Sequence, residues 1–188
     1  MNPVDAADLG LLMLRCAIGI VFIAHGYNHI FGGGKIAGTA RWFESLGMRP
    51  AIVHAWLASL TEIGAGALLI VGFITPVACA GVVAVMVVAW ITNHRTNGFF
   101  IFRPGEGYEY VMTLTLSGIA LGAVGPGRWS LDYVAHVFAP PGWLGVVITA
   151  LGLLAGAVLL LACWRPTEGD DPARRYRKAD CRDEATIS

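Results

Sequence analysis

The sequence predicts an all-α fold, a polytopic transmembrane helix bundle. Hydrophobic residues make up 56% of the 188 residues, charged residues only 14%, and the mean hydropathy is +0.64. The apolar residues come in long blocks rather than alternating with polar ones, which is typical of membrane helices. A helix needs about 20 mostly apolar residues to cross a bilayer. Five blocks reach or approach this length: 9–31, 51–72, 76–92, 108–124 and 143–164.

The first span follows a short acidic leader. Residues 1–8 carry Asp5 and Asp8 and no Lys or Arg, whereas a cleaved signal peptide begins with a basic region. We therefore expect residues 1–8 to form a short extracytoplasmic N-terminus and residues 9–31 to form a retained helix.

Turn signals separate the later spans. Between Glu62 and His94 the sequence has no formal charge and is too long for one span. We place the break at 72–76, because Pro76 lacks an N–H and is tolerated in the first turn of a helix. The span 108–124 is the shortest, and the turn 125–127 ends it.

Short helices are expected at both membrane surfaces. Behind the glycines 32–34 and again after residue 130, apolar residues recur at helical spacing, which predicts amphipathic helices at the inner and outer surface respectively. The apolar positions are Ile36, Ala40, Phe43 and Leu46 in the first, and Leu131, Val134 and Phe138 in the second. The tail 165–188 has mixed charges, so we expect it to be disordered or to touch anionic lipid.

The basic residues predict the orientation of the bundle. With the N-terminus outside and five crossings, eleven of the thirteen basic residues lie on the cytoplasmic side, Arg128 lies outside and Arg15 is buried. The positive-inside rule therefore places the C-terminus in the cytoplasm. The eleven are Lys35, Arg41, Arg49, Arg95, Arg103, Arg165, Arg174, Arg175, Arg177, Lys178 and Arg182.

Composition also excludes several classes of function. The net charge is zero, so no general affinity for nucleic acid is indicated. The cysteines, Cys16, Cys79, Cys163 and Cys181, form no C-x-x-C spacing. Neither a dithiol redox pair nor a zinc knuckle is therefore predicted, and the first three cysteines fit small buried hydrophobes.

Glu62 is a carboxylate near the middle of the second span. An isolated charge at the centre of a bilayer costs several kcal/mol, and Arg15 is the only other formal charge within a span. At 1.5 Å per residue the two differ in depth by about 6 Å, which a long Arg side chain can bridge. Two interpretations follow: a structural ion pair between Arg15 and Glu62 that sets helix register, or a carboxylate that handles protons or binds a ligand.

Polar residues gather at the predicted cytoplasmic end, because successive helices cross in alternating directions. The ligand-binding candidates at this end are His25, His29, His54, His94, Asn97, Glu109 and Tyr110. Histidines at helix ends can also simply face lipid headgroups, but His25 lies deeper, and with Glu62 and Arg15 it is a candidate catalytic residue.

His25 and His29 are separated by four residues and share one helical face. This spacing lets a helix offer two imidazoles to one metal ion. The pair is a weak metal-binding candidate, and the spacing alone predicts no metal site.

An ordered set of residues resembles the DoxX family of small bacterial membrane proteins. It covers about residues 9–133 and comprises Arg15, Gly19 and Phe22; His25-Gly26; Phe31-Gly32-Gly33; Ala37-Gly38-Thr39; Glu62, Gly64 and Gly66; Gly72 and Thr75; Asn97-Gly98-Phe99-Phe100; Glu109-Tyr110; Gly125-Pro126-Gly127; and Ser130-Leu131-Asp132.

The resemblance implies a four-helix DoxX-like core, residues 9–139, in the bacterial plasma (inner) membrane. A fifth helix, 140–164, and the charged tail, 165–188, lie outside this core. Family members often carry Lys at the position of His29, so a role for that cation would be altered here.

The family is also associated with redox chemistry. Some members resemble a subunit of a thiosulfate:quinone oxidoreductase, and others are linked to a membrane complex that joins superoxide dismutase to a sulfurtransferase.

Three hypotheses for the function remain open. The chain could be a subunit of a quinone-linked oxidoreductase, with the quinone as its cofactor and with His25 or Glu62 binding the headgroup or passing protons. It could be a non-catalytic membrane scaffold that recruits soluble redox enzymes. It could also be a transporter of small solutes or ions, because intramembrane charges mark such pathways.

Overall fold

The computed structural model describes residues 2–136 and 142–166, and within these ranges the chain is helical with no β-strand. The elements are α1 (Pro3–Phe31), α2 (Lys35–Ser45), α3 (Ala51–Val71), α4 (Thr75–Ala89), the π-helix η1 (Trp90–His94), α5 (Glu109–Val124), α6 (Leu131–Ala135) and α7 (Gly142–Cys163). The predicted all-α bundle is confirmed.

Four helices are long and apolar enough to cross a membrane: α1, α3, α4 continued by η1, and α7. The remaining predicted span, 108–124, corresponds to α5, which is apolar but has only 16 residues. The boundaries predicted from the sequence therefore agree with the structure within a few residues, except at the N-terminus.

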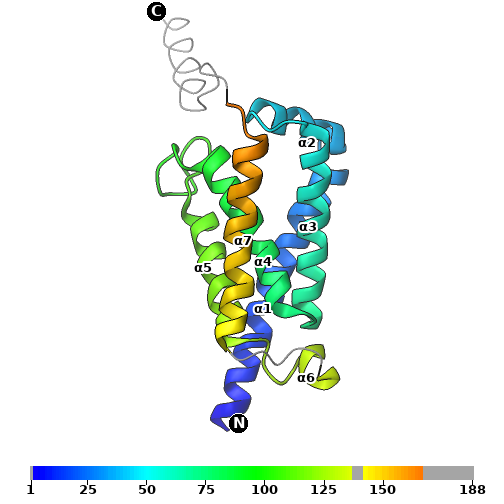
Figure 1. Cartoon of the computed structure of the whole chain (residues 1–188), viewed down its shortest axis with the longest axis vertical. Coiled ribbons are helices and arrows are strands. Elements are labelled where there is room, and N and C mark those ends of the chain that lie inside the picture. The colour runs from blue at the N-terminus through cyan, green and yellow to red at the C-terminus, as the bar shows by residue number, and fades with distance from the viewer. Residues whose placement is uncertain (1, 137–141, 167–188) are drawn as a thin grey trace, which may run out of the picture.

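The helices run between two ends of the bundle (Figure 1). The α2 end carries α2, the loop 95–108 and the last turn of α7, and the α6 end carries the chain start and α6. Apart from the buried Arg15, the basic residues of the described chain follow the same division. Lys35, Arg41, Arg49, Arg95, Arg103 and Arg165 belong to the α2 end and Arg128 to the α6 end.

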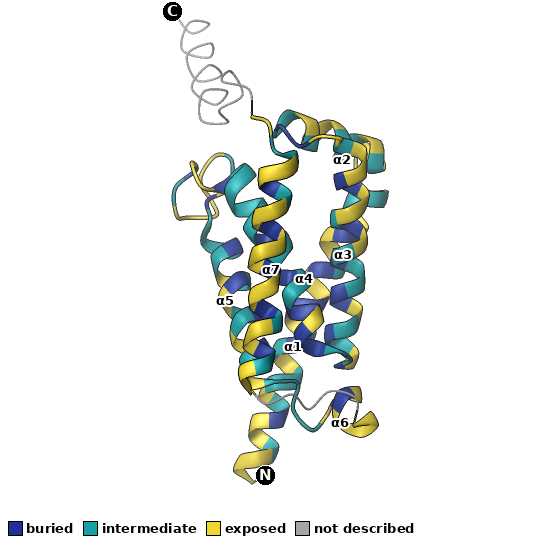
Figure 2. Cartoon of the chain, in the orientation of Figure 1, coloured by how far each residue is buried: buried dark blue, intermediate teal, exposed yellow. Residues whose placement is uncertain are grey.

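The centre of the bundle is α4, which packs against α3, α5 and α7, while α1 packs mainly against α3. The core includes Phe22, Leu69, Val82 and Leu121, each at most 2% exposed. Large apolar side chains cover the outer faces, as on α7, where Leu161 is 80% exposed (Figure 2). Such a surface suits a lipid environment, because in water it would be an aggregation hazard.

Glycines let the helices of this bundle approach closely. A Cβ at Gly66 would lie 2.6 Å from the carbonyl oxygen of Gly19, and the converse holds for Gly19. On α7, a side chain at Gly152 would overlap the carbonyl group of Ala80 on α4. Small residues at membrane helix contacts allow this packing of backbone against backbone.

The predicted break at 72–76 is confirmed, and a buried carboxylate stabilises it. Gly72 has φ +67°, the left-handed conformation that glycine adopts most readily. Asp132, which is fully buried, accepts hydrogen bonds from the backbone N–H groups of Ile74 (2.7 Å) and Thr75 (2.9 Å) at the start of α4. It thereby satisfies donors that a helix N-terminus leaves free.

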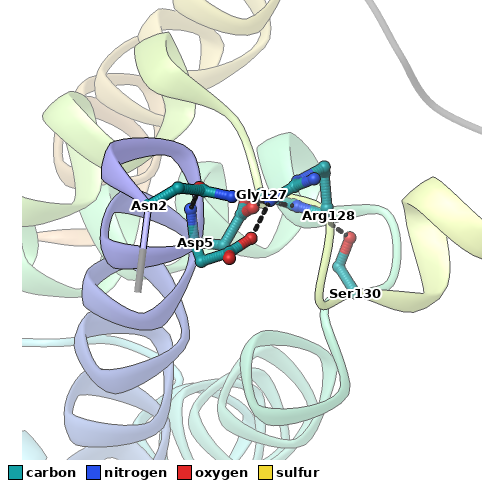
Figure 3. A network of polar contacts seen from close by, with 6 residues as sticks. Asn2, Asp5, Gly127, Arg128 and Ser130 are labelled. Carbon is teal, nitrogen blue, oxygen red and sulfur yellow. Dashed lines mark hydrogen bonds and ion pairs between the residues drawn. The ribbon is translucent and has the colours of Figure 1, made fainter.

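The first helix begins at Pro3, so the acidic leader 1–8 is mostly helical rather than a separate segment. The Asn2 side chain accepts from the Asp5 N–H, and Asp5 and the buried Asp8 bind Arg128 from the loop before α6 (Figure 3). The Nη2–Oδ1 distance to Asp5 is 2.6 Å. These carboxylates raise the pKa of the Arg128 guanidinium, because they stabilise its charged form.

Arg15 does not pair with Glu62, so the predicted structural ion pair is wrong. The buried guanidinium donates to the carbonyl oxygens of Leu69 (3.1 Å) and Trp129 (2.5 Å), near the α6 end. The reason is the axial offset of the two helices. Arg15 meets Leu69, which lies seven residues, or about 10 Å, from Glu62 along α3, and it is Gly26 of α1 that lies beside Glu62. The ends of the apolar blocks did not give this offset.

Candidate functional site

A cavity of about 280 Å³ lies within the bundle near the α2 end. All the helices except α6 contribute to its wall, and most of the lining is apolar. The polar lining residues are His25, His29, His54, Thr61, Glu62, Thr92, Asn93, His94 and Tyr110. The four histidines and Tyr110 that the sequence assigned to one end of the bundle therefore meet around one cavity, together with Glu62, which was expected near the middle of its span.

Gly26 brings the two principal polar residues together. A Cβ at this position would lie 2.7 Å from the Ser59 carbonyl oxygen and 3.1 Å from the Glu62 Cβ, so only glycine lets α1 approach α3 this closely. One turn further along α1, His29 then reaches the Glu62 side chain. The sequence Gly26-x-x-His29 thus sets the geometry of the pair.

Glu62 and His29 form a close, largely buried polar pair in the cavity. The His29 Nδ1 and Glu62 Oε2 atoms are 3.1 Å apart, and the two side chains are 15% and 5% exposed. Although they are close, the atoms are not aligned as a hydrogen bond, and neither has another partner among the described residues. Both remain able to bind a group placed in the cavity.

Helix α2 covers this pair with aromatic rings. The ring of His29 lies 6.2 Å from that of Trp42 and 6.1 Å from that of Phe43, between centroids. A hydrogen bond of 2.8 Å from Thr39 Oγ1 to the His29 carbonyl oxygen fixes α2 to the end of α1. The predicted amphipathic helix is therefore confirmed as α2, and its residues Trp42 and Phe43 form part of the cavity wall.

His54 adds another unpaired nitrogen. Its Nε2 lies 3.2 Å from the Arg49 carbonyl oxygen, which can only accept, so this nitrogen carries the proton in the neutral ring. The buried Nδ1 is then an acceptor and has no partner among the described residues.

His94 and Tyr110 form a second polar group on the opposite wall. The π-helical turn η1 places His94 inside the bundle, where it is 2% exposed. Such turns inside helices frequently occur at functional sites. His94 Nδ1 donates to the Glu106 carbonyl oxygen (2.8 Å), which leaves Nε2 to accept from the Tyr110 hydroxyl (3.0 Å).

His25 lies at the edge of the cavity rather than deep within it. It is exposed, and its ring centroid is 6.3 Å from that of Tyr110. It lies four residues further from the end of α1 than His29, as expected, but it is the more exposed of the two. His29 holds the more buried position.

Three predicted site residues do not line the cavity. Arg15 belongs to the α6 end, as described above. The Asn97 amide holds the loop 95–108 through the carbonyl oxygens of Asn93 (2.9 Å) and Gly105 (2.5 Å). Glu109, in the first turn of α5, accepts from the Ile101 N–H at 3.1 Å. Asn97 and Glu109 thus stabilise a loop.

The structure places no third metal ligand beside the predicted pair His25 and His29 within the described residues. His25 and His29 face the same cavity, but within residues 2–136 and 142–166 no group of three or more His, Cys, Asp or Glu side chains is placed to hold a metal ion.

Several lining residues were missed from the sequence. Trp42, Thr61 and Asn93 line the cavity, and so do Ala155 and Leu159 of α7. The helical spacing of α2 indicated that one of its faces is apolar, but nothing in the sequence of α7 distinguishes the cavity-lining residues from those that face lipid.

Comparison with known proteins identifies the family. The DoxX family model matches residues 10–95. The chain is 31% identical over 137 residues to the inner membrane protein YqjF of Escherichia coli, an alignment that covers 66% of this chain and 91% of that protein. This chain belongs to the DoxX family.

A second DoxX-type relative is the uncharacterized membrane protein Rv3486 of Mycobacterium tuberculosis, 30% identical over 131 residues, which cover 65% of this chain and 78% of that protein. No solved structure matches the chain. The region matched by the DoxX model spans α1 to η1 and so includes His29, Glu62 and His94, whereas α5 and α7 lie beyond it.

Proposed function

We propose that this DoxX-family protein is a membrane subunit that binds the headgroup of a lipid-soluble quinone in the cavity at the α2 end. The observation that carries the proposal is a pair of buried atoms without a hydrogen bond, His29 Nδ1 and Glu62 Oε2, which lie 3.1 Å apart in a largely apolar cavity. A buried polar group without a partner costs about 1–3 kcal/mol. A ligand that is apolar but carries oxygen atoms would recover this cost.

A quinone headgroup fits these requirements. It has a flat apolar ring, carbonyl oxygens that accept hydrogen bonds, and hydroxyl groups that donate in the reduced form. The cavity, at about 280 Å³, is at the lower limit for small-molecule sites, so it suits a single substituted ring. A bound quinone would supply the reversible uptake of two electrons and two protons.

The residues of the chain have separable roles in this proposal. His29 Nδ1, when protonated, donates to a quinone oxygen, and Glu62 accepts or returns a proton. Trp42 and Phe43 cover the ring from the side of α2, and Tyr110 offers a hydroxyl from the opposite wall. His54 Nδ1 is a further acceptor.

We also propose that the α2 end faces the cytoplasm of a bacterial cell. Its excess of basic residues supports this through the positive-inside rule. A membrane-impermeant maleimide tests the orientation in a variant whose only cysteine is Cys181. Labelling after the membrane is opened, but not in intact spheroplasts, supports the proposal, and labelling of intact spheroplasts contradicts it.

The decisive test measures bound quinone. The protein is purified in detergent from quinone-containing membranes, its quinone is quantified, and the affinity for decylubiquinone is measured for wild type, Glu62→Gln and Glu109→Gln. We expect Glu62→Gln to weaken binding by about tenfold or more, equivalent to about 1.4 kcal/mol. Glu109→Gln is the matched control, because Glu109 lies at the same end but not in the cavity. A wild-type protein that neither retains nor binds quinone contradicts the proposal.

A membrane scaffold is the second candidate function. It is favoured by the six exposed basic residues at the α2 end, from Lys35 to Arg165, which offer a surface for an acidic soluble partner. By family resemblance the partners would be superoxide dismutase and a sulfurtransferase. A colourless, quinone-free protein that still co-purifies with either enzyme supports the scaffold, and loss of this co-purification upon Arg41→Glu would identify the surface.

A further inference from the structure

The cavity has an apolar opening on the side where two helices fail to pack. Helix α3 contacts α1, α2 and α4, and helix α7 contacts α4 and α5, but α3 and α7 make no extensive contact with each other. Both nevertheless line the cavity, α3 through residues such as Leu57 and Ala58, and α7 through Ala155, Gly156 and Leu159. The cavity therefore extends between them.

The position of α7 is set by its glycines. Side chains at Gly145 and Gly152 would overlap the carbonyl groups of Gly122 on α5 and Ala80 on α4, respectively, and a Cβ at Gly156 would lie 3.1 Å from the Ala84 carbonyl oxygen. One face of α7 is thus held against α4 and α5. Ala155, next to this face, borders the cavity and remains exposed.

The α2 end of this gap is closed by the chain itself. Trp164 Nε1 donates to the Leu46 carbonyl oxygen (2.8 Å), the Arg49 N–H to that of Cys163 (3.0 Å), and the Arg165 N–H to that of Gly47 (2.7 Å). These bonds tie the end of α7 to the loop between α2 and α3. Together with α2 they cover the cavity where the bundle meets the polar surface.

What remains open between α3 and α7 is apolar. Leu57 lines the cavity from α3 and is 47% exposed, and Ala155 and the half-buried Leu159 line it from α7. An opening lined by such residues at the level of the membrane helices favours a ligand that arrives from the hydrocarbon phase rather than from water. The exposed His25 marks a different edge of the cavity, at α1.

We infer that the cavity is entered from the bilayer through a portal between α3 and α7, bordered by Leu57, Ala155 and Leu159, and that the hydrocarbon tail of the bound molecule leaves through it. The nature of the headgroup rests on the proposed function, but the portal does not. Helix α7, which lies beyond the DoxX-matched residues, is then a wall of the binding site rather than only an anchor.

The first experiment blocks the portal. Ala155→Trp places a large side chain at its edge, and Ala157→Trp is the matched control, because Ala157 is exposed on the same helix but does not line the cavity. Both variants and wild type are titrated with decylubiquinone and with the analogue that lacks the decyl tail.

We expect Ala155→Trp to weaken decylubiquinone binding by about tenfold, with a change below about threefold for the tailless analogue and for Ala157→Trp. Equal effects of the two tryptophans, or loss of binding in His25→Trp but not in Ala155→Trp, would overturn the portal.

The second experiment does not depend on quinone. A fatty acid with a diazirine in its chain is photolysed in phosphatidylcholine vesicles that contain the protein, and the labelled peptides are mapped. We expect label at Ala58 and Thr61, inside the cavity, in wild type and Ala157→Trp, and a loss of about fivefold or more in Ala155→Trp.

The two readouts separate the possible failures. If quinone does not bind but the label behaves as expected, the proposed function fails and the portal stands. An absence of label at the cavity residues of wild type overturns the portal even if quinone binds.

Discussion

Replacing Arg15 by methionine tests the most unexpected contact of the structure. Methionine has an unbranched apolar side chain but lacks the two donor groups. The Trp129 carbonyl oxygen therefore loses its hydrogen bond from Arg15, and the Leu69 carbonyl oxygen keeps only its hydrogen bond from the Gly72 N–H. Asp132, whose backbone N–H bonds to Gly72 beside the Arg15 guanidinium, also remains buried without a positive charge nearby.

The expected cost follows from these contacts. A hydrogen bond to a charged group contributes about 1.5–3 kcal/mol, so two such bonds give a gross loss of about 3–6 kcal/mol. Removing a buried guanidinium also relieves its desolvation cost, which places the net loss near the lower value, about 3 kcal/mol. For a chain of this length we expect the Tm in detergent to fall by about 6–12 °C.

Double-mutant cycles then identify the charge partner of Arg15. If it is Asp132, Arg15→Met should cost less in an Asp132→Asn background, with a coupling of about 1 kcal/mol, and should be additive with Glu62→Gln within about 0.5 kcal/mol. The control is Arg165→Met, because the side chain of exposed Arg165 bonds only to carbonyl groups of its own helix end, and the change should alter stability by less than about 0.5 kcal/mol. Stronger coupling of Arg15 with Glu62 than with Asp132 would refute the reasoning and restore the predicted ion pair.

Three further predictions concern the packing and ends of the bundle. Gly66→Val should destabilise the protein by about 1–3 kcal/mol in thermal unfolding, because its side chain meets the Gly19 backbone, whereas Gly64→Val, with no neighbour within 4 Å, should not. Asp8→Asn should lower the Tm more than Asp5→Asn, since Asp8 is buried and binds both the backbone N–H and the guanidinium of Arg128; equal shifts would contradict this. Trp164→Phe removes the hydrogen bond to Leu46, so it should lower the free energy of local opening by about 1 kcal/mol and speed amide hydrogen exchange of residues 46–49 by roughly fivefold. Trp143 is exposed, so Trp143→Phe should leave this exchange unchanged.

The helices and their ends were largely predictable from the sequence. Long apolar blocks imply membrane helices because an exposed backbone cannot be solvated in hydrocarbon, and the break before Pro76 follows from the missing N–H of proline. The start of α1 was not predictable. Asp5 and Asp8 look like a solvated leader until the loop that carries Arg128, 120 residues away in sequence, folds against them.

The candidate site was predicted in part. Alternating crossings brought the histidines and Tyr110 to one end, and they surround one cavity that also includes Glu62, which was expected near mid-span. The pairing of Glu62 was wrong, because counting residues from the ends of two apolar blocks does not give the axial offset between the helices, which places Arg15 beside Leu69, about 10 Å from Glu62 along α3. The contact with His29 depends on the close approach that Gly26 permits.

Composition and periodicity were therefore sufficient for the class of protein, the number of helical segments and the end at which polar residues collect, because each of these depends on local chain chemistry and on the thickness of a bilayer. Tertiary structure decided which polar atoms meet, which remain without a partner and where the cavity opens. These properties depend on the rotation of each helix and on glycine contacts between distant segments, such as Gly19 with Gly66 and Gly152 with Ala80.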